Sequence, residues 1–124
     1  MNQVPTESFE QQTLFHWARY YRGKYPELDL MYHIPNEGKR SYSTGRRMLA
    51  EGLKPGVPDI CLPVARGGYH SLYIELKRRE GGRVTQAQTQ WLGALRDAGH
   101  MATVCKGWEE ASEMILRYLQ MPKG

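Results

Sequence analysis

This sequence has few cysteines and no long hydrophobic run. Its two cysteines, Cys61 and Cys105, lie inside apolar runs, and neither has a second cysteine or a histidine at zinc-site spacing. We therefore interpret both as small core residues in a reducing compartment. No stretch approaches the roughly 18 apolar residues that a transmembrane helix needs. The first residues contain neither a basic nor an apolar segment, so we expect a cytoplasmic protein without a secretory signal.

The chain also lacks internal repeats, low-complexity segments and linker-like stretches. At 124 residues it has the length of a single domain, which we take as residues 1–124. Hydrophobic residues make up 40% of the sequence and charged residues 24%. This composition is typical of a globular domain with its own core, and it excludes a disordered tail.

Positive charge exceeds negative charge, and the excess is unevenly spread. Seventeen Lys and Arg residues face thirteen Asp and Glu residues, which gives a formal net charge of +4. Two basic clusters stand out, in residues 37–54 and residues 66–83. Such clusters fit a polyanionic partner such as nucleic acid, although a solvated, mildly basic surface is the simpler alternative.

The residue pattern predicts a mixed α/β domain. We expect four helices, over residues 7–22, 43–51, 85–99 and 108–119. We expect four strands, over residues 28–34, 59–62, 71–78 and 101–105. The resulting order is α, β, α, β, β, α, β, α around a small central sheet. Thr6 and Thr85 are the expected helix N-caps, and Gln88 stands at the capping-box position after Thr85.

The first predicted helix carries carboxylates on its apolar face. Apolar residues from Leu14 to Tyr21 recur at the spacing of one buried helix face. Glu7, Glu10 and Gln11 extend the same stripe toward the N-terminus. At least one carboxylate would then point along the inner surface. The alternative, which the pattern alone favours, is that both glutamates complement the positive end of the helix dipole.

The strongest candidate for a functional site is a group of three charged residues on two predicted strands. Glu75 and Lys77 project from one face of their strand, because side chains alternate with a period of two. If strands 59–62 and 71–78 pair as a hairpin, Asp59 lies near Glu75. Two carboxylates in one small volume repel each other, and a divalent cation such as Mg²⁺ or Mn²⁺ relieves that repulsion. Such a cation lowers the pKa of a water ligand, and Lys77 would stabilise charge on a phosphate.

A plainer interpretation of Glu75 and Lys77 is a surface salt bridge worth ~0–1 kcal/mol. The neighbouring segments favour the chemical interpretation. Pro58-Asp59 opens one strand, Ile74-Glu75-Leu76-Lys77 closes the next, and basic clusters flank both.

The order of these motifs resembles that of a known nuclease family. The segment Gly-Leu-Lys-Pro-Gly-Val-Pro-Asp at 52–59, followed by Ile-Glu-Leu-Lys at 74–77, resembles the PD-(D/E)xK nuclease signature. Further matches are Ile34-Pro35-Asn36, Thr85-x-x-Gln88-x-x-Trp91-Leu92, Gly99, Val104 and Gly107-Trp108. From about Glu7 to Tyr118, the chain is similar to a stand-alone VRR-NUC (virus-type replication-repair nuclease) domain.

This resemblance implies a restriction-endonuclease-like α/β core, with a mixed central sheet flanked by helices. It implies that Asp59, Glu75 and the backbone carbonyl of Leu76 hold a metal ion and that Lys77 is the catalytic lysine. Gln88 matches the family's glutamine that reaches back to the active centre. We do not expect one side chain to fill that role and the capping box together.

A glutamate of the first helix completes the site that the resemblance implies. Glu7 matches that position better than Glu10, because Gln11 follows Glu7 by four residues. Glu10 is the second choice.

The implied activity is a Mg²⁺-dependent deoxyribonuclease, with Mn²⁺ able to substitute, that acts in replication, recombination or DNA repair. Stand-alone members resemble phage-encoded structure-specific nucleases and Holliday junction resolvases, which act as homodimers. Branched or flap DNA is then the expected partner, in a phage or bacterial setting, with no membrane and no organic cofactor. The DNA contacts, mostly to phosphates, are expected from Lys39, Arg40, Arg46, Arg47, Lys54, Arg78, Arg79 and Arg83.

Three other functions fit parts of the sequence. A non-catalytic DNA-binding module on the same fold is one, although the intact set of Asp59, Glu75, Lys77 and Gln88 argues against a decayed site. A sequence-specific restriction-type nuclease is another, but 124 residues leave little room for base readout. A small protein-interaction domain is the third, and salt-sensitive DNA binding would separate it from the others.

Overall fold

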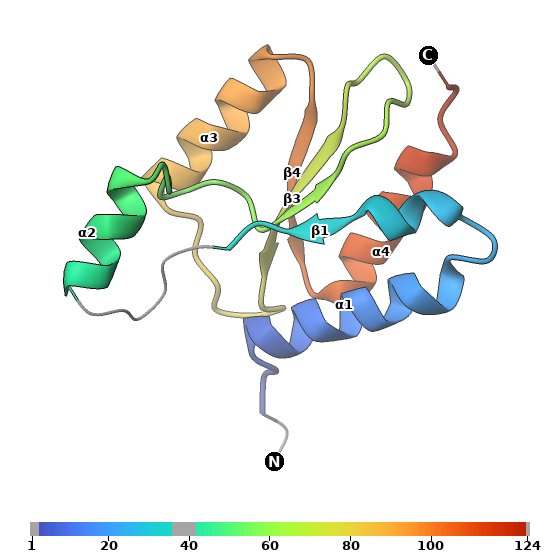
Figure 1. The fold of residues 1–124 in the computed structure, drawn as a ribbon. Coiled ribbons are helices and arrows are strands. Elements are labelled where there is room, and N and C mark those ends of the chain that lie inside the picture. Colours follow the sequence, from blue (N-terminus) through green and yellow to red (C-terminus); the bar gives the residue numbers. More distant parts are fainter. Residues whose placement is uncertain (1–2, 36–41, 124) are drawn as a thin grey trace.

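A computed structural model describes residues 3–35 and 42–123, which form a mixed α/β fold (Figure 1). The elements are α1 (Glu7–Tyr21), the 3₁₀ helix η1 (Pro26–Leu30), β1 (Tyr32–His33), α2 (Tyr42–Ala50), β2 (Ile60–Leu62), β3 (Leu72–Lys77), α3 (Gln86–Asp97), β4 (Met101–Lys106) and α4 (Trp108–Leu119). The predicted fold class and the order of helices and strands are confirmed. Within these residues, no helix is both long and apolar enough to cross a bilayer.

The described strands form one sheet in the order β1-β2-β3-β4. β1 pairs with β2 and β2 with β3 in antiparallel fashion, whereas β4 is parallel to β3 and is reached through α3. Ile60 lies opposite Ile74 in the β2–β3 register. The predicted antiparallel pairing is therefore present, and it brings Asp59, just before β2, to the level of Glu75.

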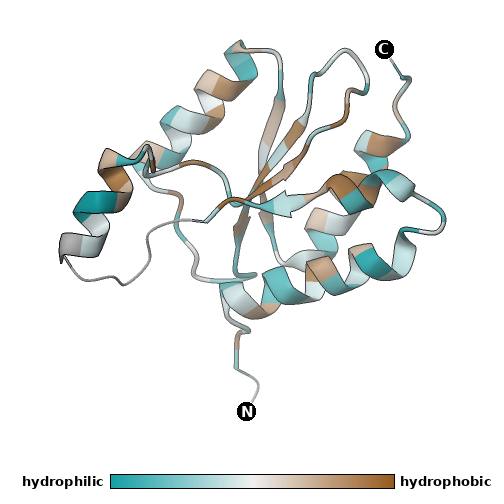
Figure 2. Ribbon diagram, viewed as in Figure 1, coloured by the Kyte–Doolittle hydropathy of each residue, from teal (hydrophilic) through white to brown (hydrophobic). Residues whose placement is uncertain are grey.

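Helices cover both faces of the sheet. Residues of α1 and α4, such as Leu14 and Ile115, share one buried cluster with Ile74 and Leu76 of β3. α3 packs on β4, on the side of the sheet opposite to α1 and α4 (Figure 1). The hydrophobic segments run through the central strands in Figure 2. β3 is covered on both faces, so all its side chains except the partly buried Tyr73 are buried, and this is why Glu75 and Lys77 are withdrawn from water.

The predicted strand over 28–34 is wrong in its first half. Pro26 occupies the start of η1, where its fixed φ suits a helical turn. Leu28 and Met31 are both buried, and a spacing of three residues matches the 3₁₀ repeat. The strand is therefore restricted to Tyr32 and His33, which are both exposed.

The loop before Asp59 is packed closely on α3. Gly56 has φ +92°, and a Cβ atom placed on it would lie 2.7 Å from the backbone carbon of Ala87. Only glycine accepts both that backbone conformation and that approach. The loop that leads to Asp59 thus rests on the first turn of α3, next to Gln88.

Candidate active site

A hydrogen bond from a backbone amide of β3 holds the Asp59 carboxylate in place. The Leu76 amide donates to Asp59 Oδ2 at 2.8 Å. The Asp59 carbonyl in turn accepts from the Ile34 amide at 2.7 Å and lies 2.8 Å from His33 Nδ1. Both ends of the residue are therefore held, and its carboxylate stays beside Glu75.

Glu75 lies in an environment that disfavours its charge. Its side chain is 2% exposed, and its Oε1 atom is buried with no donor reaching it from the described residues. Oε2 lies 3.4 Å from Lys77 Nζ. Burial, and then the neighbouring charge of Asp59, raise the pKa of Glu75 to about 8 against the opposing effect of Lys77.

Two crowded carboxylates with an unpartnered oxygen fit a hard divalent cation. Carboxylate oxygens are the ligands that Mg²⁺ prefers, and it needs only one or two of them. Within residues 3–35 and 42–123, no group of three or more His, Cys, Asp or Glu side chains comes together. A cation held by Asp59 and Glu75 would have backbone oxygen and water available as further ligands.

Gln88 fills two roles, and the expectation that it would fill only one is wrong. Its Oε1 accepts from the Thr85 amide at 2.8 Å, while Thr85 Oγ1 accepts from the Gln88 amide at 3.2 Å. Its Nε2 donates to Glu75 Oε2 at 3.0 Å. A side-chain amide has an acceptor end and a donor end, so one residue both caps α3 and orients Glu75.

Of the two candidate glutamates in α1, Glu10 is the one that points inward. Glu10 is 0% exposed, whereas Glu7 is exposed in the first turn. The interpretation of both residues as simple helix-dipole partners, which the pattern favoured, is therefore wrong for Glu10.

The Glu10 carboxylate accepts three hydrogen bonds. Arg79 donates to it twice, from Nε at 2.9 Å and from Nη2 at 3.1 Å, and the Trp108 amide donates at 3.1 Å. The Arg79 guanidinium lowers the pKa of Glu10, so this carboxylate stays ionised. Glu10 thus joins α1, the end of β3 and the start of α4, and a role at the metal for Glu7, or for Glu10 as the second choice, stays a prediction.

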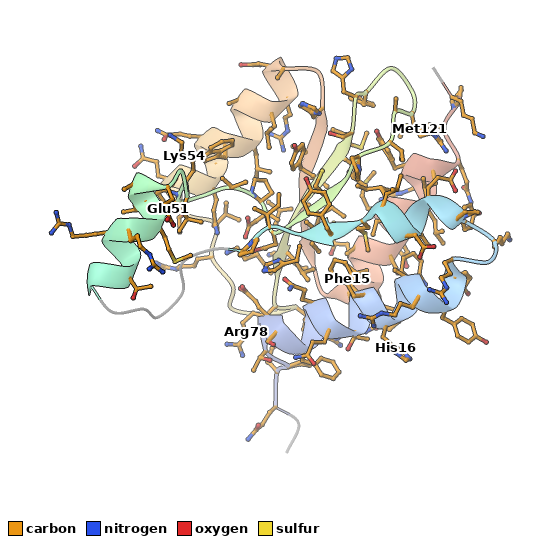
Figure 3. The ribbon with its side chains drawn as sticks, in the orientation of Figure 1. Phe15, His16, Glu51, Lys54, Arg78 and Met121 are labelled. Carbon is orange, nitrogen blue, oxygen red and sulfur yellow. The ribbon has the colours of Figure 1, made fainter. Side chains whose placement is uncertain are left out.

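The predicted DNA-binding residues fall into three groups. Arg46, Arg47, Lys54 and Arg83 are exposed and Arg78 is half-buried, with Lys54 and Arg78 labelled in Figure 3. Lys39 and Arg40 lie outside the described residues. Arg79 differs from the others, because its guanidinium is paired with Glu10 and with Glu109 at 3.2 Å. It therefore has a role in the fold, and its contact with DNA stays a prediction.

The sequence places His33 near the predicted site but favours a partly buried polar side chain, whereas His33 is exposed. Its contact with the Asp59 carbonyl could not be predicted, because it depends on the β1–β2 register. The only signal in the sequence was its place next to the Ile34-Pro35-Asn36 motif.

Comparisons with known proteins identify the family and support the fold. A family model for the VRR-NUC domain matches residues 6–109, a range that includes Asp59, Glu75, Lys77 and Gln88. Among solved structures, a protein described as a VRR_NUC domain protein superposes with a TM-score of 0.85 and 28% sequence identity. The superposition covers 98% of this chain and 94% of the other. A search of curated proteins finds no match.

Proposed function

This chain belongs to the VRR-NUC domain family, and we propose that it is a divalent-metal-dependent DNA endonuclease acting on branched or flap DNA. Family membership implies a nuclease-type domain with DNA as its substrate. The observation that carries the finer proposal is that Asp59, Glu75 and Lys77 lie close together where β2 pairs with β3. The three side chains combine two carboxylates, which are the proposed cation ligands, with one buried ammonium group.

The proposed cation, Mg²⁺ with Mn²⁺ as a substitute, would be held by Asp59, Glu75 and the backbone carbonyl of Leu76. The buried Glu75 Oε1, which no donor among residues 3–35 and 42–123 reaches, supports this assignment. When bound, such a cation supplies an acidified water and neutralises charge on the scissile phosphate.

The chain's own residues would prepare the reacting groups. The Leu76 amide holds the Asp59 carboxylate, and Gln88 holds that of Glu75. Lys77 is 6% exposed, so its ammonium group faces the site from an environment with little water and would stabilise the developing phosphate charge. Groups that are held in place before the reaction need no reorganisation during it.

Structure specificity follows from how the chain would hold DNA. Arg46, Arg47, Lys54, Arg78 and Arg83 would bind phosphates, and phosphate contacts carry no direct sequence information. Such contacts read the shape and charge of the DNA. We propose in addition that two copies act as a homodimer in the cytoplasm and cut two strands of one junction.

The test is cleavage of end-labelled synthetic DNA in Mg²⁺, Mn²⁺ or EDTA. The substrates are a four-way junction, a flap, a linear duplex and a single strand, and light scattering of the junction complex gives the number of protein copies. We expect cutting in both cations, none in EDTA, and faster cutting of the junction or flap than of the duplex.

Other outcomes identify the alternative functions. Cutting in EDTA contradicts the metal dependence, and equal cutting of every substrate contradicts the structure specificity. Tight, salt-sensitive junction binding without cutting supports the non-catalytic module, and a fixed cut within one duplex sequence supports a restriction-type enzyme.

The double role of Gln88 gives a prediction with an internal control. Gln88→Ala and Thr85→Ala each remove part of the α3 cap, and each should lower the free energy of unfolding by about 1 kcal/mol. Gln88→Ala alone also frees Glu75, so we expect it alone to slow cleavage by about tenfold. Denaturant unfolding and single-turnover cleavage measure the two effects. Equal slowing by both variants would mean that Gln88 acts through the cap alone.

A further inference from the structure

A groove of about 770 Å³ runs along the side of α1 that is not buried in the core. Of the described residues that line it, nine come from α1 and the residue before it, and the tenth is His33 of β1. The residues that line it are Thr6, Ser8, Phe9, Gln11, Gln12, Thr13, Phe15, His16, Arg19 and His33. Figure 3 shows Phe15 and His16 on this helix.

The groove combines aromatic faces with polar groups that donate and accept hydrogen bonds. Phe9 is 50% exposed, although burying such a ring would be favourable, whereas Phe15 is partly buried against the hydrophobic core. Gln11 and Gln12 supply amides and Arg19 supplies a cation, and no carboxylate is among the lining residues that the structure describes. This chemistry matches nucleotides whose bases are unpaired, because such bases offer a flat face to stack and polar edges to bond.

One end of the groove adjoins the candidate active site. His33 lines the groove and its Nδ1 also lies 2.8 Å from the Asp59 carbonyl oxygen. At the start of the same helix, Glu10 is tied to Arg79, two residues after Lys77. A strand that leaves the site along α1 would therefore enter the groove within a short distance of the scissile phosphate.

We propose that this α1 groove binds the unpaired strand of the DNA substrate beside the branch point. The proposal rests on DNA being the substrate, as proposed above, and names which part of it this surface recognises. Paired bases in a duplex are stacked on each other and cannot stack on Phe9. The groove thus gives flap DNA, which carries unpaired bases, a contact that linear duplex lacks.

The test measures DNA binding in EDTA, where binding is separated from metal-dependent cutting. Fluorescence polarisation would compare a labelled oligothymidylate, a flap and a linear duplex. We expect Phe9→Ala to weaken binding of the oligothymidylate and the flap by about tenfold, the effect of one lost stacking contact, and to leave duplex binding unchanged. Tyr20→Ala is the matched control, because Tyr20 is an aromatic residue of α1 that is 83% exposed and lies outside the groove.

A second measurement maps the contact without any substitution. In an NMR titration with oligothymidylate, the amide signals of residues 8–19 should shift first. Three results would overturn the proposal: shifts confined to other elements, equal weakening of duplex and single strand by Phe9→Ala, or equal effects of Tyr20→Ala and Phe9→Ala. Groove binding of oligothymidylate by a protein that cuts no DNA in Mg²⁺ would instead support the groove and contradict the proposed nuclease function.

Discussion

Lys77→Ala should lower the turnover number of DNA cleavage by at least ~100-fold, which is the usual effect of removing one preorganised donor from a transition state. Lys77 is 6% exposed and lies 3.4 Å from Glu75 Oε2. Its loss removes a positive charge where negative charge develops, and water cannot easily replace it in a buried position. Glu75 also loses the Lys77 ammonium group, which opposes the rise of the Glu75 pKa.

The comparison needs a variant that keeps the packing and one that removes a nearby charge. Lys77→Met keeps the apolar stem and should lose as much activity as Lys77→Ala, with a smaller change in melting temperature. Lys106→Ala removes the lysine that lies beside Lys77 in the β3–β4 register but is exposed. Single-turnover kinetics should show a far smaller effect for Lys106→Ala, and near-normal cleavage by Lys77→Met would contradict a catalytic role for the ammonium group.

Glu10→Ala should lower the free energy of unfolding by about 3 kcal/mol, toward the lower end of what breaking a buried ion pair costs. Three hydrogen bonds are lost, two from Arg79 and one from the Trp108 amide. Arg79 remains partly exposed and can form hydrogen bonds with water instead. The Trp108 amide loses its acceptor, and removing the fully buried Glu10 side chain leaves a cavity.

Glu109→Ala is the matched control for Glu10→Ala. Glu109 contacts the same guanidinium at 3.2 Å but is exposed, so its removal should cost less than about 1 kcal/mol. Urea unfolding of the two variants measures the difference. Equal destabilisation would show that burial adds nothing to the Glu10–Arg79 pair.

The sequence predicted the centre of the candidate site well, because that centre depends on short-range rules. The alternation of side chains along 71–78 places Glu75 and Lys77 on one face, and neighbouring strands that pair bring Asp59 to them. The prediction of a strand over 28–34 was wrong in its first half, also because of short-range spacing. Buried residues three apart, Leu28 and Met31, follow a 3₁₀ repeat that an apolar run alone does not distinguish from a strand.

Contacts between distant segments were beyond the reach of the pattern. Helical spacing shows which face Glu10 occupies, but it does not identify Arg79 as its partner, and charge alone assigned Arg79 to DNA. The contact between His33 and Asp59 likewise requires the register of β1. Gln88 was misjudged for a chemical reason, since its two amide ends serve different partners.

The hydrogen bond from the Leu76 amide to Asp59 has a consequence for how variants are interpreted. Just before the start of β2, a side chain replaces a backbone carbonyl as the acceptor for the Leu76 amide of β3. Substituting Asp59 therefore removes a proposed ligand and loosens the junction between β2 and β3 in one step, so lost turnover in such a variant has two possible origins. The hydrogen-exchange rate of the Leu76 amide separates the two origins. Faster exchange in the variant reports local opening of the strands, whereas an unchanged rate points to the lost ligand.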